Sequence, residues 1–205
     1  KNFAGKFGDF GCFSLHPLKN LNVWGDGGFV IAKNKKLYEA LRLMRNHGLV
    51  SRNKNLIFGY NSRLDTIQAV VANHLFKKIK KITNKRVKNS LYLEKRLKNI
   101  KGLVFKKRFK YLLEVFHLYE FRLQNSKLRD PLVKYLRKND IDAKIHYPIP
   151  MHLQPAAKKY GYKKGDFPMT ELIANTTISL PVHEFISTKQ LKYMIQTIKK
   201  FFNES

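Results

Sequence analysis

Apolar residues recur at two different spacings in the first part of the chain, and the spacing predicts where strands and helices form. Residues 8–15 and 28–32 are short apolar runs bounded by turn residues, which is typical of strands. Over residues 35–45 the apolar positions recur every three or four residues, which indicates a helix. Asn34 precedes this helix as a candidate N-cap, and Gly48 lies just past its end.

The middle of the chain carries the longest helical pattern. Ser62-Arg-Leu-Asp65 has the form of a capping box, which predicts that a helix begins there. Apolar residues at helical spacing continue to Ile82, and a second helical pattern follows and ends near Lys101-Gly102. We interpret this pair of helices as a connection between two domains, residues 1–80 and residues 81–205, with the boundary near residue 80.

Beyond this boundary the apolar spacing changes to two. Over residues 114–123 the positions 115, 117, 119, 121 and 123 form one set, mostly apolar, and alternate with a second set that includes Glu114, Glu120 and Arg122. This spacing of two predicts a strand covered on at least one face. A helix is expected from Ser126 to about Asn139, and a further strand over residues 141–146. Strand, helix and strand in this order indicate a small α+β layer.

The last part of the chain is rich in proline and glycine before it becomes helical again. Pro148 and Pro150 force an extended backbone, because each restricts the residue before it. A loop-rich stretch then leads to a short strand near residues 178–181. Ser187-Thr-Lys-Gln190 is a second capping box, and the final helix is expected to follow it.

Composition limits the classes of protein that the chain can represent. It has 205 residues, of which 43% are hydrophobic and 13% aromatic, as in globular domains. Its single cysteine, Cys12, excludes a disulfide within the chain and a cysteine-based metal site. The seven histidines do not form a ligand-spaced set with carboxylates, so no metal is expected. No apolar run approaches a membrane span, and we expect a cytoplasmic protein without a membrane partner.

The formal charge of +27 raises the alternative of a domain that binds nucleic acid or another polyanion. The excess is spread from Lys33 to Lys200 and consists mostly of lysine on expected helix surfaces. No nucleic-acid-binding motif accompanies it. We therefore expect no nucleic-acid partner. Steep loss of polyanion binding with rising salt would favour the alternative.

Lys19 stands in an unusual place for a cation. Between Phe7 and Ala32 it is the only lysine or arginine, and its neighbours in sequence are apolar, including Leu18 and Trp24. One interpretation is that the side chain extends from a strand end to water. The other is chemical, because a desolvated lysine can form a Schiff base with a carbonyl compound.

Five sequence blocks favour the chemical interpretation, and together they extend over almost the whole chain. They are Ser14-Leu-His-Pro-Leu-Lys19-Asn-Leu with Gly25-Asp-Gly-Gly28, Arg45-Asn-His-Gly48, Gly59-Tyr-Asn-Ser-Arg-Leu-Asp-Thr-Ile-Gln-Ala69, Ile145-His-Tyr-Pro-Ile-Pro-Met-His-Leu-Gln-Pro155 and Ile178-Ser-Leu-Pro-Val-His183. In this order they resemble the DegT/StrS family of sugar aminotransferases, which use pyridoxal 5'-phosphate (PLP).

The resemblance implies roles for three residues of the first domain in binding the cofactor. Lys19 would form the Schiff base with PLP and move the substrate proton, while Ser14 would bind the PLP phosphate. Asn61 would reach the phosphate of the neighbouring subunit's PLP. Taken alone, Ser14 is equally a serine at a strand end and Asn61 a helix cap.

Three further residues are implied in binding the substrate. Arg63 would bind an anionic part of the substrate across the dimer, or it is a surface charge. His146 and Tyr147 would face the sugar at a rim stiffened by the following prolines. A structural role for His146 is the alternative. Cys12, His16 and Trp24 are interpreted as packing around the lysine loop.

The fold implied is α/β, the C-terminal part of a fold-type-I PLP transferase. Residues 1–80 would hold the last strands of the large mixed sheet and the first linker helix, and residues 81–205 the small α+β domain. The partners implied are a nucleotide-linked keto sugar, an amino-acid donor, with glutamate expected, and a second copy forming a homodimer with shared active sites.

The family members are considerably longer, so the resemblance also implies that other PLP ligands precede Lys1 and that this chain alone has little activity. Such a chain would serve the synthesis of a surface polysaccharide or related glycan. A catalytically silent dimerisation module is the remaining alternative.

Overall fold

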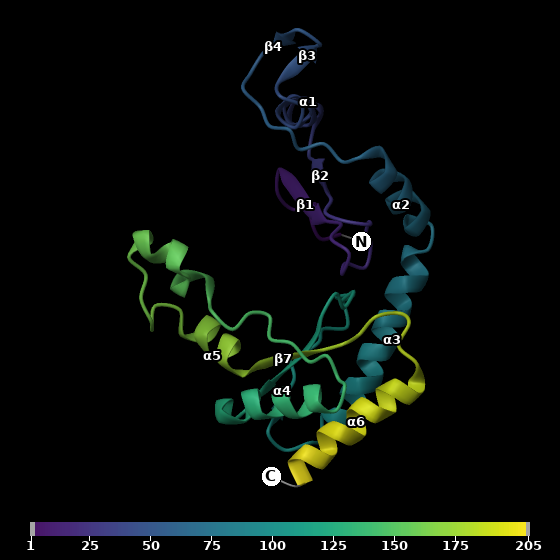
Figure 1. The fold of residues 1–205 in the computed structure, drawn as a ribbon, viewed down its shortest axis with the longest axis vertical. Helices are drawn as coiled ribbons and strands as arrows, with labels where there is room; N and C mark the ends of the chain where they lie inside the picture. The colour runs from purple at the N-terminus through teal and green to yellow at the C-terminus, as the bar shows by residue number, and fades with distance from the viewer. Residues whose placement is uncertain (1–2, 204–205) are drawn as a thin grey trace. The chain divides into compact units, whose positions relative to one another are not determined.

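The computed structural model describes residues 3–203. The chain folds into two compact units, Lys1–Lys80 and Lys81–Ser205, and Figure 1 shows their elements along the chain. The boundary lies at the position expected from the helical pattern. The assignment of the units to the two domains of an enzyme remains a prediction.

The first unit opens with a two-stranded antiparallel sheet of β1 (Phe10–Ser14) and β2 (Gly28–Ala32), as the apolar runs predict. Ser14 pairs with Gly28, so the loop between the strands starts and ends at the same end of the sheet. Leu15 N donates to Gly27 O at 2.8 Å and Val23 N donates to Leu15 O at 2.9 Å. Both Leu15 and Val23 are buried. The loop is therefore a closed structure anchored by two apolar side chains.

Helix α1 (Lys35–Met44) follows, and its N-cap prediction is confirmed, because Asn34 Oδ1 accepts from Leu37 N at 3.0 Å. After the helix the backbone is left-handed at His47, with φ 56°, and at Gly48, with φ 71°. A Cβ atom at Gly48 would lie 1.8 Å from the Ile57 carbonyl oxygen. This position therefore requires glycine for two reasons, conformation and close approach. A hairpin of β3 (Leu49–Ser51) and β4 (Lys54–Asn55) follows.

The long helical pattern forms two helices, α2 (Thr66–Phe76) and α3 (Ile79–Leu97). The predicted capping box at residues 62–65 is wrong: Asp65 occupies the N-cap position and makes no side-chain cap bond. Ser62 N instead donates to Arg45 O at 3.0 Å, so the Ser62 amide is bonded outside the helix. The interruption falls at residues 77–78, not after Ile82. Like-charged lysines three and four residues apart at 77, 78, 80 and 81 disfavour a continuous helix there.

The second unit is built around an antiparallel sheet in the order β5 (Leu103–Val104), β6 (Tyr119–Leu123) and β7 (Thr177–Leu180). Strand β6 alternates as predicted but begins at Tyr119, not residue 114. The cause is Phe116, whose φ of 49° is incompatible with an extended strand.

The strand expected over residues 141–146 is wrong. The backbone turns tightly there, because Ala143 N donates to Ile141 O at 2.7 Å. What remains of the pairing is a single bridge, in which Lys144 and Ser179 exchange backbone bonds of 3.0 and 2.8 Å. His146 and Tyr147 therefore follow a bridge and not a continuous strand.

Helices cover this sheet: α4 (Arg129–Lys138) contacts both β7 and α6 (Thr188–Asn203), as Figure 1 shows. The Ser187 capping box is confirmed: Ser187 Oγ accepts from Gln190 N at 3.2 Å and Gln190 Oε1 accepts from Ser187 N at 2.9 Å. The stretch expected to be loop-rich contains short helices as well. The helical elements are the 3₁₀ turn η1 (Ser126–Leu128), α4 (Arg129–Lys138), the 3₁₀ turns η2 (Met151–Leu153) and η3 (Pro155–Tyr160), α5 (Pro168–Thr176) and α6 (Thr188–Asn203).

The two units differ in their cores. The second unit has one continuous apolar core in which α3, α4 and α6 pack on the sheet, with Leu93, Leu132, Ile178 and Ile198 fully buried. Among residues 3–80 the buried hydrophobic side chains are Leu15, Val23 and Val71. The first unit therefore leaves much apolar surface exposed, including most residues of the apolar strands β1 and β2.

Candidate active site

The loop between β1 and β2 holds Lys19 in a tightly bonded turn. Lys19 N donates to His16 O at 2.8 Å, and Leu18 N donates to His16 Nδ1 at 3.2 Å. Asn22 Nδ2 donates to Lys19 O at 3.0 Å. The backbone of Lys19 is therefore held on both of its polar groups, and the residue is half-buried. Such a turn fixes where the amine of the lysine can reach.

The environment of this turn differs from the apolar core that the sequence suggests. Leu18 is 63% exposed and Trp24 is 77% exposed, and Cys12 and His16 are also exposed. The expectation that Cys12, His16 and Trp24 pack around the loop is therefore wrong. The small core of this unit accepts Leu15 and Val23, whereas Leu18 and Trp24 are exposed and Lys19 is half-buried.

Gln68 on α2 holds the end of the same loop, and the sequence analysis did not single it out. Its Oε1 accepts from Trp24 N at 2.7 Å, and its Nε2 donates to Trp24 O at 2.9 Å. The pair is separated by 44 positions in the sequence. The sequence could have indicated this role only through the position of Gln68 in the 59–69 block, because an amide side chain there needs a polar partner.

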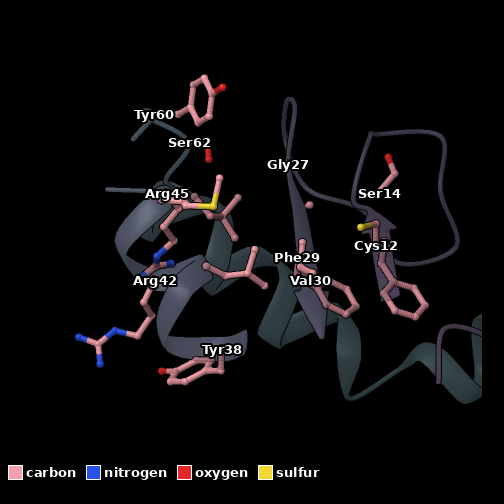
Figure 2. Close-up of a pocket in the computed structure, with 15 residues that line it drawn as sticks. Cys12, Ser14, Gly27, Phe29, Val30, Tyr38, Arg42, Arg45, Tyr60 and Ser62 are labelled. Atoms are coloured by element: carbon pink, nitrogen blue, oxygen red, sulfur yellow. The ribbon is translucent and has the colours of Figure 1, made fainter. Parts of the chain in front are cut away.

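Ser14 lines a cavity of about 930 Å³ between the sheet and α1. Figure 2 shows Ser14 and Cys12 of β1 on one side of β2, and Arg42 of α1 with its C-cap Arg45 on the other. Tyr60 and Ser62 also line the cavity. Ser14 Oγ accepts from His16 N at 3.2 Å. Apolar side chains from β2 and α1 complete the wall: Phe29, Val30, Leu41 and Met44. The cavity offers cationic and hydroxyl groups beside apolar surface, which suits an anion carried on a flat, largely apolar body.

Asn61 and Arg63 contact each other at the next turn of the chain. Arg63 Nε donates to Asn61 Oδ1 at 3.0 Å, and both residues are exposed. Asn61 forms a bridge with Asn46 and is not a helix cap, because α2 begins at Thr66. Arg63 borders a second hollow of about 400 Å³ together with Arg42 and Arg45. Glu39 lines the same hollow and pairs with Arg42, so the three guanidinium groups leave a net positive charge that favours an anionic ligand.

His146 and Tyr147 lie in the second unit. His146 Nδ1 is 2.9 Å from Ser179 Oγ, and the two rings of the pair meet edge to face with centroids 5.5 Å apart. Tyr147 is 73% exposed, so its hydroxyl is accessible to a ligand. The predicted site residues thus form two groups, with Ser14, Lys19, Asn61 and Arg63 in one unit and this pair in the other.

Two classes of function gain no support from the described part of the chain. Among residues 3–203, no group of three or more histidine, cysteine, aspartate or glutamate side chains is placed to hold a metal ion. Within the same range, no helix is both long enough and apolar enough to cross a membrane.

The sequence of the chain matches the model of the DegT/DnrJ/EryC1/StrS aminotransferase family over residues 2–199. The chain belongs to this family. A pleiotropic regulatory protein of Geobacillus stearothermophilus is 33% identical over 97% of this chain and 53% of its own length. The UDP-N-acetyl-3-dehydro-alpha-D-glucosamine 3-aminotransferase of Acidithiobacillus ferrooxidans is 32% identical over 96% and 52%.

Solved structures of family members confirm the fold class. The structure of DesV of S. venezuelae in complex with a ketimine intermediate matches with a TM-score of 0.90 and 29% identity, over 96% of this chain and 53% of that one. A family aminotransferase from Brucella abortus matches with a TM-score of 0.88 and 29% identity, over 97% and 52%. The predicted α/β fold of a PLP aminotransferase is therefore confirmed. The chain spans about half the length of the relatives and structures that it matches.

The cofactor of this family is PLP, and the first unit fits such a group. Lys19 is held in a fixed turn five residues after Ser14. Ser14 lines the cavity of about 930 Å³, whereas Lys19 is not one of its lining residues. A volume of this size accommodates a small-molecule cofactor. The hydroxyl and guanidinium groups on its wall are the types that bind a phosphate.

Proposed function

We propose that this chain carries the lysine-bearing part of a PLP-dependent aminotransferase that converts a keto group of a nucleotide-linked sugar to an amine. The observation that carries the proposal is the bonded turn of Lys19, placed by β1 and β2 within a sequence that matches the family over residues 2–199. A lysine that must form a Schiff base, release it and return a proton to the substrate has to act at one point. The hydrogen bonds to both of its backbone groups meet this geometric need.

Each site residue of the first unit has a role that follows from its chemistry. When bound, PLP supplies the electron sink that stabilises the substrate carbanion. Lys19 would hold the cofactor through its Nζ and would carry the substrate proton on the same atom. Ser14 offers a hydroxyl to the cofactor phosphate. Asn61 extends toward the phosphate in the partner subunit of a homodimer, and Arg63 binds an anionic part of the substrate.

The second unit supplies the polar groups for the sugar. His146 presents its imidazole beside the exposed hydroxyl of Tyr147, and both groups bind sugar hydroxyls through hydrogen bonds. The excess of cationic side chains in the chain favours a substrate that carries a diphosphate.

The names of several relatives support a keto group at carbon 3 as the site of amino transfer. Besides the Acidithiobacillus enzyme, the UDP-2-acetamido-2-deoxy-3-oxo-D-glucuronate aminotransferase of Pseudomonas aeruginosa is 29% identical over 88% of this chain and 48% of its own length. We include glutamate as the amino donor, a cytoplasmic location and a glycan-building role in the proposal.

The test is the reaction of the purified chain with PLP. We expect an absorbance band near the range of protonated Schiff bases, trapped by borohydride as a phosphopyridoxyl group on Lys19 in peptide mass spectra. Lys19→Arg should lose both signals. Lys33→Arg, an exposed lysine just after β2, is the matched control and should retain them. Trapping at surface lysines with equal yield in both variants would refute the proposal and favour a catalytically silent module.

A further inference from the structure

Glu120, Ser179 and His146 form a continuous chain of hydrogen bonds in the second unit. Ser179 Oγ donates to Glu120 Oε1 at 3.2 Å, and the same Oγ lies 2.9 Å from His146 Nδ1. Glu120 and Ser179 stand directly opposite each other on β6 and β7, so their side chains share one face of the sheet. The backbone bridge between Lys144 and Ser179 fixes the chain two residues before His146.

The number of protons available to Ser179 decides how the histidine is protonated. A serine hydroxyl has one proton to donate, and an ionised carboxylate can only accept. Since Ser179 gives its proton to Glu120, its oxygen can only accept from His146, which places a proton on Nδ1. In the reverse arrangement, the Ser179 and Glu120 oxygens would face each other at 3.2 Å without a proton between them. Ser179 is 3% exposed, so water does not readily relieve such a contact.

We infer that Ser179 and Glu120 are positioning residues that hold neutral His146 as its Nδ1–H tautomer and leave Nε2 as a hydrogen-bond acceptor. Nε2 then accepts from a hydroxyl of the sugar substrate, and this last step alone rests on the proposed function. The arrangement gives the imidazole a fixed orientation and polarity, as carboxylates do for histidines elsewhere through a hydrogen bond to one ring nitrogen.

The role extends to specificity, because a ring nitrogen with only a lone pair favours a donor and disfavours an acceptor. A sugar hydroxyl that can donate is therefore accepted at this position. A group that offers only lone pairs, such as a carbonyl or an ether oxygen, leaves Nε2 without a partner.

The tautomer can be measured directly by nitrogen-15 magnetic resonance of the labelled chain in alkaline buffer, where the imidazole is neutral. Long-range nitrogen–proton spectra distinguish a protonated from an unprotonated ring nitrogen, and His146→Gln assigns the signals. In the wild-type chain we expect Nδ1 at the protonated shift and Nε2 at the unprotonated shift. Ser179→Ala removes the acceptor, and we expect the proton to move at least in part to Nε2.

Glu120→Leu gives a second and opposite perturbation. It keeps the serine but removes its acceptor, so the hydroxyl turns to donate to Nδ1 and the tautomer should switch to Nε2–H. Glu120→Gln retains a carbonyl acceptor and should restore much of the wild-type pattern. Ser126→Ala, an exposed serine of the same unit, is the control and should change nothing. Backbone amide spectra of β6 and β7 verify that the sheet persists in each variant.

The outcomes separate this inference from the proposed function, because the tautomer is read without cofactor or sugar. A wild-type Nε2–H tautomer, or an unchanged tautomer in both Ser179→Ala and Glu120→Leu with the sheet intact, overturns the positioning role. An Nδ1–H tautomer that switches as expected, in a chain that fails to trap PLP at Lys19, supports the positioning role and overturns the proposed function.

Discussion

Replacing Arg86 with leucine should lower the free energy of unfolding of the second unit by about 3–5 kcal/mol, the cost of breaking a buried ion pair from one side. The Arg86 side chain is 8% exposed, and its Nε lies 3.3 Å from Oε2 of Glu184, whose side chain is 16% exposed. Its Nη1 also donates to Val182 O at 3.2 Å and to His117 O at 3.4 Å. The variant leaves a carboxylate and two carbonyl groups without this partner.

The sign of the pair's own contribution can also be worked out from the structure. Burial lowers the pKa of Arg86, although the charge of Glu184 raises it. Desolvation thus exceeds the attraction for this guanidinium. We therefore expect Arg86→Leu with Glu184→Leu to regain most of the loss, because apolar residues of similar volume replace buried ion pairs at little cost.

Urea unfolding followed by circular dichroism measures these differences as a double-mutant cycle. The control is Arg42→Leu, which breaks an exposed pair with Glu39 and should cost no more than about 1 kcal/mol. If Arg86→Leu costs as little as Arg42→Leu, the burial of the pair has no energetic consequence and the reasoning is refuted. A double variant as unstable as Arg86→Leu would refute the balance between desolvation and attraction.

Gly48→Ala should be more destabilising than Gly161→Ala: both backbones are left-handed, a cost of about 1–2 kcal/mol for alanine, but only the former clashes with a carbonyl oxygen. Equal melting shifts would contradict the clash. Asn34→Ala removes the N-cap of α1 and should cost about 1 kcal/mol of helix stability. Amide hydrogen exchange in α1 measures this cost, and Asn203→Ala, at the end of α6, is the control. Unchanged exchange protection of α1 in Asn34→Ala would contradict the role of the cap. A hydrogen bond from Gly165 N lowers the pKa of Glu171 in the folded chain. The ionised carboxylate therefore contributes its full stabilisation above the unfolded pKa of about 4.3. This stabilisation is lost as the pH falls through the lower pKa of the folded state. Glu171→Gln should flatten that acid limb of the unfolding curve, and an unaltered limb would contradict the assignment.

Local patterns predicted the elements where a single segment carries enough information. β1 and β2 follow from apolar runs, and the caps at Asn34 and Ser187 follow from side chains that bond within their own helix turn. The errors arise where another segment decides. Ser62 resembles a helix start, but its amide is engaged by Arg45, and the left-handed Phe116 delays the start of β6.

The candidate site was predictable in its chemistry and not in its supports. Lys19 and Ser14 belong to one continuous motif, so a resemblance of sequence could assign them roles. Gln68 acts on a residue 44 positions away, and Ser179 acts on a histidine 33 positions away. A polar side chain carries no mark of which distant group it will bond, so these supporting residues appear only when the chain is folded.

The bonds between Gln68 and Trp24 involve a side-chain amide on one partner and only the backbone on the other. The glutamine side chain therefore bonds to the backbone as a peptide group of a neighbouring strand would. These two hydrogen bonds do not depend on which side chain stands at position 24. Substitutions at that exposed position can change the surface beside the lysine turn without loosening it, whereas position 68 tolerates no such exchange. The loop thus separates a position open to variation from the position that maintains its geometry.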